Sequence, residues 1–302
     1  MKKKWLAMGT GIGVGAVMLL ASGFTAAAGS SGYDVYKAAL KNNLAVSSIT
    51  GNLHVTVTDN DAELLQVQSN VKADFNRHDA SAAIQADSSA GGTKAVHVYR
   101  QEDKTIVKPS DSDVYRVMEP AGGKWQNHSG KPALTGDAEN VIDALVGHLR
   151  DQVTLEDGAN GGKLVSLHLS GEQVPVAVNA LGSFIIKKAS SMEHGNGQWD
   201  GEHGQNPAPS IDLKPNLPKL TDEISVQEID LDAAINRDNY IEHETAKIVI
   251  VGKDEAGKKH EVAVNLAVDL TDLNRTVPDH VDLSGKEVET VPVDSMRHRS
   301  WH

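Results

Sequence analysis

The stretch Val262-Ala-Val-Asn-Leu-Ala-Val-Asp-Leu270 has the cleanest alternation of large apolar and smaller or polar residues in the chain. Successive side chains of a β-strand point to opposite faces of a sheet, so this stretch predicts a strand buried on one face. Residues 53–58 repeat the pattern, with leucine and valine alternating with histidine and threonine. Ala246–Val251 is apolar on both faces, which is typical of a covered central strand. A β-sheet is therefore the centre of the predicted fold.

Further alternating stretches follow one another through the first 120 residues. They are Val67–Phe75, Ser81–Ala86, Lys94–Arg100, Thr105–Lys108 and Val114–Met118. Short turn-forming clusters such as Asp59-Asn60-Asp61 separate them, and short connections join antiparallel neighbours because a parallel return needs a dozen or more residues. Two later strands are predicted at Leu164–Ser170 and Ile224–Leu231, the second with a bulge where the alternation slips at Gln227-Glu228. The sequence predicts an antiparallel meander with added strands.

Three helices are predicted beside these strands. Ser31, followed three residues later by Asp34, predicts a capping box at the start of a short helix that ends at Asn42-Asn43. Apolar residues at helical spacing predict two more helices, over residues 137–150 and 174–192. Their apolar stripes comprise Val141, Ile142, Leu145, Val146 and Leu149 in the first, and Val178, Leu181, Phe184 and Ile185 in the second. Such stripes pack on another apolar surface, so the predicted class is α+β, an antiparallel sheet covered by a few amphipathic helices.

The chain is predicted to form a single α+β domain over residues 31–292. A long flexible loop is expected at 194–220, where glycine, proline, asparagine and histidine replace apolar residues. The last residues, 293–302, have no burial pattern and are expected to form a disordered tail.

The N-terminus has the features of an export signal. Met1-Lys-Lys-Lys-Trp5 is positively charged, residues 6–24 are apolar or small, and Thr25-Ala-Ala-Ala-Gly29 has the small residues that signal peptidase accepts. A signal peptide over residues 1–28 is predicted. The alternative is an uncleaved membrane anchor, because about 19 weakly polar residues can span a bilayer. Either way the protein is expected in the cell envelope or outside the cell, with membrane contact only through residues 6–24.

Composition excludes several classes of protein. The 302 residues include 29 Lys+Arg and 41 Asp+Glu, a net charge of −12, which argues against a nucleic-acid partner. The chain has no cysteine, and this removes disulfides, thiolate catalysis and cysteine-bound metals. With 39% hydrophobic and 23% charged residues, the composition is that of a globular protein.

Histidine is abundant, with 13 residues, and is a common metal ligand. His194 and His203 flank Asp200 and Glu202, but three glycines between these histidines leave the segment without preorganisation. His194 and His203 are therefore weak candidates, and neither a metal site nor a cofactor is predicted. Three further histidines fall in predicted strands and are expected to be satisfied surface residues: His54, His97 and His168.

No motif for catalysis is found. The chain has no Gly-x-Ser-x-Gly elbow, and Ser69 and Lys72 have the Ser-x-x-Lys spacing in a predicted strand rather than a helix. With 4 Trp, 5 Tyr and 3 Phe it is poor in the aromatics that usually stack on sugars. The protein is predicted not to be an enzyme, and an unrecognised hydrolase is kept only as a third possibility.

Three segments resemble the lipoprotein-carrier superfamily, whose members include LolA-like and LppX-like proteins. They are Tyr33-Asp-Val-Tyr-Lys-Ala-Ala-Leu40, Ser47-Ser-Ile-Thr-Gly-Asn-Leu-His-Val55 and Asn274-Arg-Thr-Val-Pro-Asp-His-Val-Asp-Leu-Ser-Gly-Lys286. The resemblance is to exported Gram-positive members and spans residues 31–292. It implies a curved antiparallel half-barrel whose concave apolar face is closed by helices and holds acyl chains. Phe24 follows Leu20-Ala-Ser-Gly23 where lipoprotein members have the lipid-bearing cysteine, so a lipid tether is not expected.

The leading hypothesis for function is non-catalytic binding or carriage of a lipid-like or other hydrophobic ligand at the cell envelope. The helix at 174–192 or the helix at 137–150 is expected to move as a lid, and small residues on the concave face, with Ala73, Ala83 and Ala95 as examples, would make room. The candidate cavity and lid residues are Val178, Leu181, Phe184, Ile185, Val141 and Leu145. The alternative is an envelope sensory or protein-interaction module with a filled core, anchored by its N-terminal segment.

Overall fold

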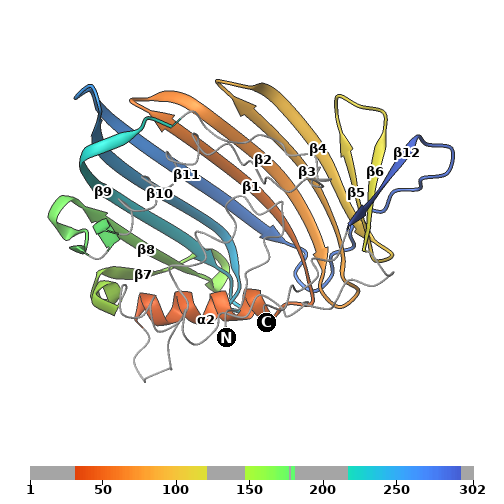
Figure 1. Ribbon diagram of the computed structural model, residues 1–302. Helices are drawn as coiled ribbons and strands as arrows, with labels where there is room; N and C mark the ends of the chain where they lie inside the picture. The colour runs from red at the N-terminus through yellow and green to blue at the C-terminus, as the bar shows by residue number, and fades with distance from the viewer. Residues whose placement is uncertain (1–30, 121–146, 177, 181–216, 294–302) are drawn as a thin grey trace, which may run out of the picture.

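The computed structural model describes residues 31–120, 147–176, 178–180 and 217–293. One strongly curved sheet dominates these residues, and helix α2 (Gly32–Ala45) lies across one end of it (Figure 1). The sheet has 12 strands in the order β12-β6-β5-β4-β3-β2-β1-β11-β10-β9-β8-β7. β1 and β11 therefore pair in the middle and join two halves: the meander β1–β6 and the strands β7–β11.

The strands follow the alternating stretches of the sequence. In the first half they are β1 (Ser48–Asp59), β2 (Ala62–Asp74), β3 (Asp79–Ser88), β4 (Gly92–Gln101), β5 (Lys104–Pro109) and β6 (Tyr115–Pro120). In the second half they are β7 (Val153–Asp157), β8 (Lys163–Ser170), β9 (Leu220–Ile235), β10 (Ile241–Asp254) and β11 (Lys259–Thr271). The last strand, β12 (Val288–Val293), pairs with β6 at the edge of the first half. Three 3₁₀ turns lie between them: η2 (Gly147–Gln152), η3 (Ala159–Gly161) and η4 (Gly171–Gln173).

The two faces of the sheet follow from its register. Leu53 pairs with Val268 and Val55 with Leu266, so the apolar residues of β1 and β11 share one side, which we call the apolar face. The opposite side, which we call the outer face, carries His54 and Thr56. The predicted bulge is present, because Val249 pairs with Glu228 while the next residue, Ile250, pairs with Val226.

The predicted α+β class is wrong, because the described residues form a 12-stranded mixed sheet with few helices and two unjoined edges, β12 and β7. β12 is parallel to β6, whereas every strand was expected to be antiparallel. The end of the helix predicted at 137–150 is the 3₁₀ turn η2, and residues 137–146 lie outside the described residues. Of the helix predicted at 174–192, residues 176 and 178–180 are helical, and 181–192 are not described. The expected curvature of the sheet agrees with the structure (Figure 1).

Helix α2 begins with the predicted capping box. Ser31 Oγ accepts from the Asp34 amide at 3.3 Å, and Asp34 also pairs with Arg150 of η2 at 2.6 Å. The helix runs past the predicted end to Ala45 because Asn43 does not cap it. The Asn43 side chain instead bonds the backbone of Ile241, donating to its carbonyl at 2.9 Å and accepting from its amide at 2.8 Å. Tyr33, Tyr36, Ala39 and Leu40 are buried in the main core, which lies against the apolar face.

Residues 272–287 cross the outer face of the first half of the sheet. Thr276 bonds Thr50 of β1 at 2.9 Å, and the Lys72 ammonium of β2 bonds Asp279 at 2.8 Å. The backbone of Val281 bonds the Gln101 side chain of β4 in both directions, at 2.8 and 2.9 Å. Val281 then packs on Ile106 and Val117 in a second, smaller core. This crossing explains why β12 arrives at β6 in the parallel direction.

Candidate ligand-binding face

The apolar face extends beyond the area that α2 occupies. α2 lies against β7, β8, β9 and β10 (Figure 1). On β2–β4 the apolar face continues through Val71, Ala82 and Val98, which lie side by side in the register of the three strands. All three side chains are only half-buried, in contrast to the fully buried Val165 and Leu169 of β8, a strand that α2 contacts. The apolar face is therefore partly accessible around these three residues, whereas Val67, Ala86 and Val96 on the same face are fully buried.

Small residues are concentrated on this part of the face. They come from β1–β3, and they are Gly51, Ser69, Ala73, Ala80, Ala82 and Ala86. The corresponding positions of β10 and β11 are mostly valine, leucine and isoleucine. This group is called here the small-residue patch. Short side chains fill less space above the backbone, which suits contact with a flexible apolar ligand.

Two of the three small residues expected at this site lie elsewhere. Ala73 belongs to the patch, where it pairs with Ala80. Ala83 pairs with Asn70 and His97, and Ala95 pairs with Gln85, so both face outward. The expectation was wrong for Ala83 and Ala95 because the face of a strand residue depends on register, which composition does not reveal.

The residues predicted as lid or cavity lining are described only in part. Val178 is half-buried and packs against the main core, and the side chain of the next residue, Asn179, accepts from the Val226 amide at 2.8 Å. The start of the predicted lid is thus held against β9. The other candidates lie outside the described residues: Leu181, Phe184, Ile185, Val141 and Leu145. The weak metal candidates His194 and His203 lie outside them as well.

A carboxyl group lies on the apolar face beneath α2. Glu244 of β10 pairs in register with Val268 and is 5% exposed, and the Tyr36 hydroxyl of α2 donates to it at 3.1 Å. Burial raises the pKa of Glu244 to about 7, against the smaller opposing effects of Tyr36 and His243. The same burial, together with the charge of Glu244, raises the pKa of Tyr36. The sequence held a signal for this buried acid, because Glu244 has the same parity as Ala246, Ile248 and Ile250.

A cation lies at one end of the small-residue patch. Arg100 of β4 pairs in register with Ala80, so it shares the apolar face, and it is half-buried. The guanidinium is always charged and matches the geometry of carboxylates and phosphates. An apolar area that ends at such a group suits an amphiphilic ligand.

Comparison with known proteins shows little. No family model matches the sequence. No curated protein matches it either. A LolA superfamily protein from Nitrosomonas europaea aligns with 85% of this chain and 97% of its own, at 7% identity and a TM-score of 0.21. A β-barrel-like protein of a domain of unknown function from Brucella abortus aligns with 75% of this chain and 98% of its own, at 9% identity and a TM-score of 0.16.

Among the described residues, no helix combines the length and hydrophobicity that crossing a membrane requires.

Proposed function

We propose that this protein is an exported, non-catalytic binding protein of the cell envelope that holds a lipid-like ligand on the apolar face of β1–β4. The observation that carries the proposal is the small-residue patch, which lies beyond α2 and is flanked by half-buried apolar side chains. Hydrocarbon transferred from water to such a surface gains about 0.8 kcal/mol per buried methylene. A chain of ten or more methylenes would therefore bind without any reacting group in the protein.

Two further features support the proposal. Arg100 at the end of the patch favours a ligand with an anionic head group over a neutral one. The lysine-rich start and apolar segment of residues 1–28 support export as a signal peptide, or as an anchor if they are retained. In this proposal the segment 174–192 covers the ligand, with Val178 at its described start.

The test compares two substitutions on the same strand. Ala82→Phe fills the patch, whereas Ala83→Phe adds the same side chain to the outer face. The probe is a fluorescent long-chain fatty acid, titrated into residues 29–302 purified without detergent, with native mass spectrometry alongside. We expect wild type and Ala83→Phe to bind the probe equally and Ala82→Phe to bind it on the order of tenfold more weakly or worse. Circular dichroism checks that both variants are folded.

Two results would overturn the proposal. If the wild-type protein shows only its apo mass and does not bind the fatty-acid probe, the alternative of a protein-interaction module is favoured. Equal weakening by Ala82→Phe and Ala83→Phe would show that the patch is not where the probe binds.

A further inference from the structure

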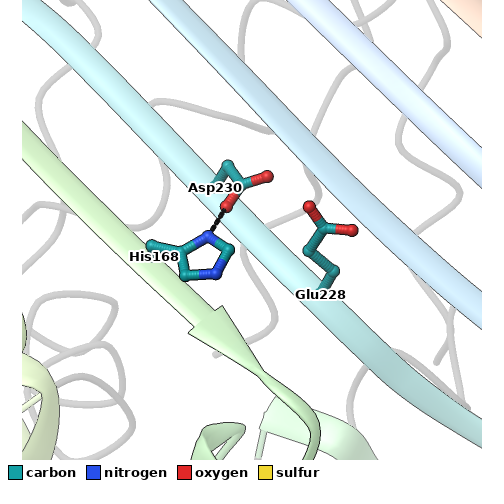
Figure 2. Close-up of side chains that lie close together, drawn as sticks. All are labelled: His168, Glu228 and Asp230. Carbon is teal, nitrogen blue, oxygen red and sulfur yellow. Dashed lines mark hydrogen bonds and ion pairs between the residues drawn. The ribbon is translucent and has the colours of Figure 1, made fainter.

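Three metal-ligating side chains meet on the outer face of β8 and β9 (Figure 2), in the half of the sheet that does not carry the small-residue patch. His168 pairs in register with Asp230, and its Nδ1 contacts the Asp230 carboxylate. Glu228 lies two residues before Asp230 and so points to the same face. One potential ligand atom from each of His168, Glu228 and Asp230 lies within 4.8 Å of the other two.

The charges of this cluster favour a cation. Glu228 and Asp230 lie on the same face of β9, and two carboxylates this close repel each other. The Lys247 ammonium of β10 neutralises Glu228, contacting both of its carboxylate oxygens at 3.0 Å. Lys247 also pairs in register with Asp230, but no bond from its ammonium to Asp230 accompanies those to Glu228. A cation between His168 and the two acids would relieve the remaining repulsion.

The donor set indicates which cation fits. One imidazole nitrogen and two carboxylates suit zinc and its neighbours in the first transition series, whereas calcium and magnesium prefer oxygen ligands alone. Three protein ligands leave further positions open to water. Tetrahedral zinc with bonds of about 2.1 Å places its ligand atoms about 3.4 Å apart, so modest side-chain rotation brings these atoms into range.

The cluster also has the preorganisation that the glycine-rich segment around His194 and His203 lacks. All three side chains come from paired strands of one sheet, and the β8–β9 ladder fixes the distance between them. A similar pair on the same face, His243 with Asp269 at 2.7 Å, has one carboxylate only. We propose that His168, Asp230 and Glu228 form a surface site for a divalent transition metal such as Zn²⁺, with the remaining positions filled by water.

The experiment is a Zn²⁺ titration of the untagged protein in competition with a chromophoric chelator. The chain has 13 histidines, so the measured quantity is the difference between wild type and each variant. We expect His168→Ala and the nearly isosteric Asp230→Asn to lose one equivalent of binding or to weaken it on the order of tenfold. His243→Ala, the matched control, should bind as the wild type does. His168 and His243 are both exposed, so neither substitution threatens the fold.

Lys247→Met gives a result of opposite sign. Removing the ammonium that competes for Glu228 should tighten zinc binding several-fold, which a histidine acting alone would not show. The proposal is overturned if His168→Ala binds as much zinc as the wild type, if His243→Ala loses as much as His168→Ala, or if Lys247→Met leaves the affinity unchanged or weaker.

Discussion

Glu244 should make the stability of the fold depend on pH. Its pKa is about 7 in the folded protein, compared with 4.5 for an unperturbed glutamate, because burial penalises the carboxylate. Between these two values the folded state holds a proton that the unfolded state has lost, so the free energy of unfolding falls as pH rises. Below pH 4.5 the group is protonated in both states, and above pH 7 the full penalty is present.

Glu244→Gln keeps a hydrogen-bonding partner for Tyr36 and removes the charge. Since raising the pKa from 4.5 to about 7 corresponds to about 3 kcal/mol, the variant should be more stable than wild type by up to that amount at pH 8 and similar to it at pH 4.5. Urea unfolding at several pH values measures the difference. Glu261→Gln, an exposed acid on the neighbouring strand β11, is the control and should follow the wild-type curve. If the free energies of unfolding of wild type and Glu244→Gln change in parallel with pH, the raised pKa of Glu244 is contradicted.

Among the elements, α2 is bonded to the backbone of β10 through the side chain of Asn43. Asn43 is 5% exposed and makes two bonds to the backbone of Ile241, so Asn43→Ala would leave a buried amide and a buried carbonyl without these partners. We expect a loss of about 2–4 kcal/mol in the free energy of unfolding. Asn42→Ala is the matched control, because Asn42 makes a single half-buried bond to Asn239 and should cost about 1 kcal/mol or less. Equal losses in urea unfolding would show that Asn43 does not anchor the helix.

The elements also show what the sequence could predict. Alternation identified β1 and β11, and the slip at Gln227-Glu228 identified a bulge, because period and parity are local properties of a strand. The capping box at Ser31 was likewise local. The crossing segment 272–287 has no regular spacing of apolar residues. The parallel pairing of β12 with β6 follows from the path of that segment across the outer face. The position of Ala83 and the contact of His168 with Asp230 depend on register between strands, which one sequence does not give.

At the scale of the whole molecule, the sheet has two separate cores on its two faces. The main core joins α2 to β1–β3 and β8–β11 on the apolar face. The smaller core lies on the outer face, where Val281 covers Ile106 and Val117. On the outer face, the edge formed by β4–β6 and β12 depends for its packing on the crossing segment. The molecule should therefore open at this edge before the main core unfolds.

Val281→Asp tests this order of opening. Val281 is 9% exposed, so the substitution buries a carboxylate in the smaller core and should cost about 3 kcal/mol there. Hydrogen exchange followed by mass spectrometry should then show faster exchange in peptides from residues 104–119 and 288–293, and unchanged protection in residues 224–271. Val277→Asp on the same segment is the control, because Val277 is 66% exposed and should leave exchange as in the wild type. If Val281→Asp instead raised exchange evenly across the sheet, the two cores would unfold as one unit, and the ladder of β1 with β11 would couple the halves more tightly than their separate packing implies.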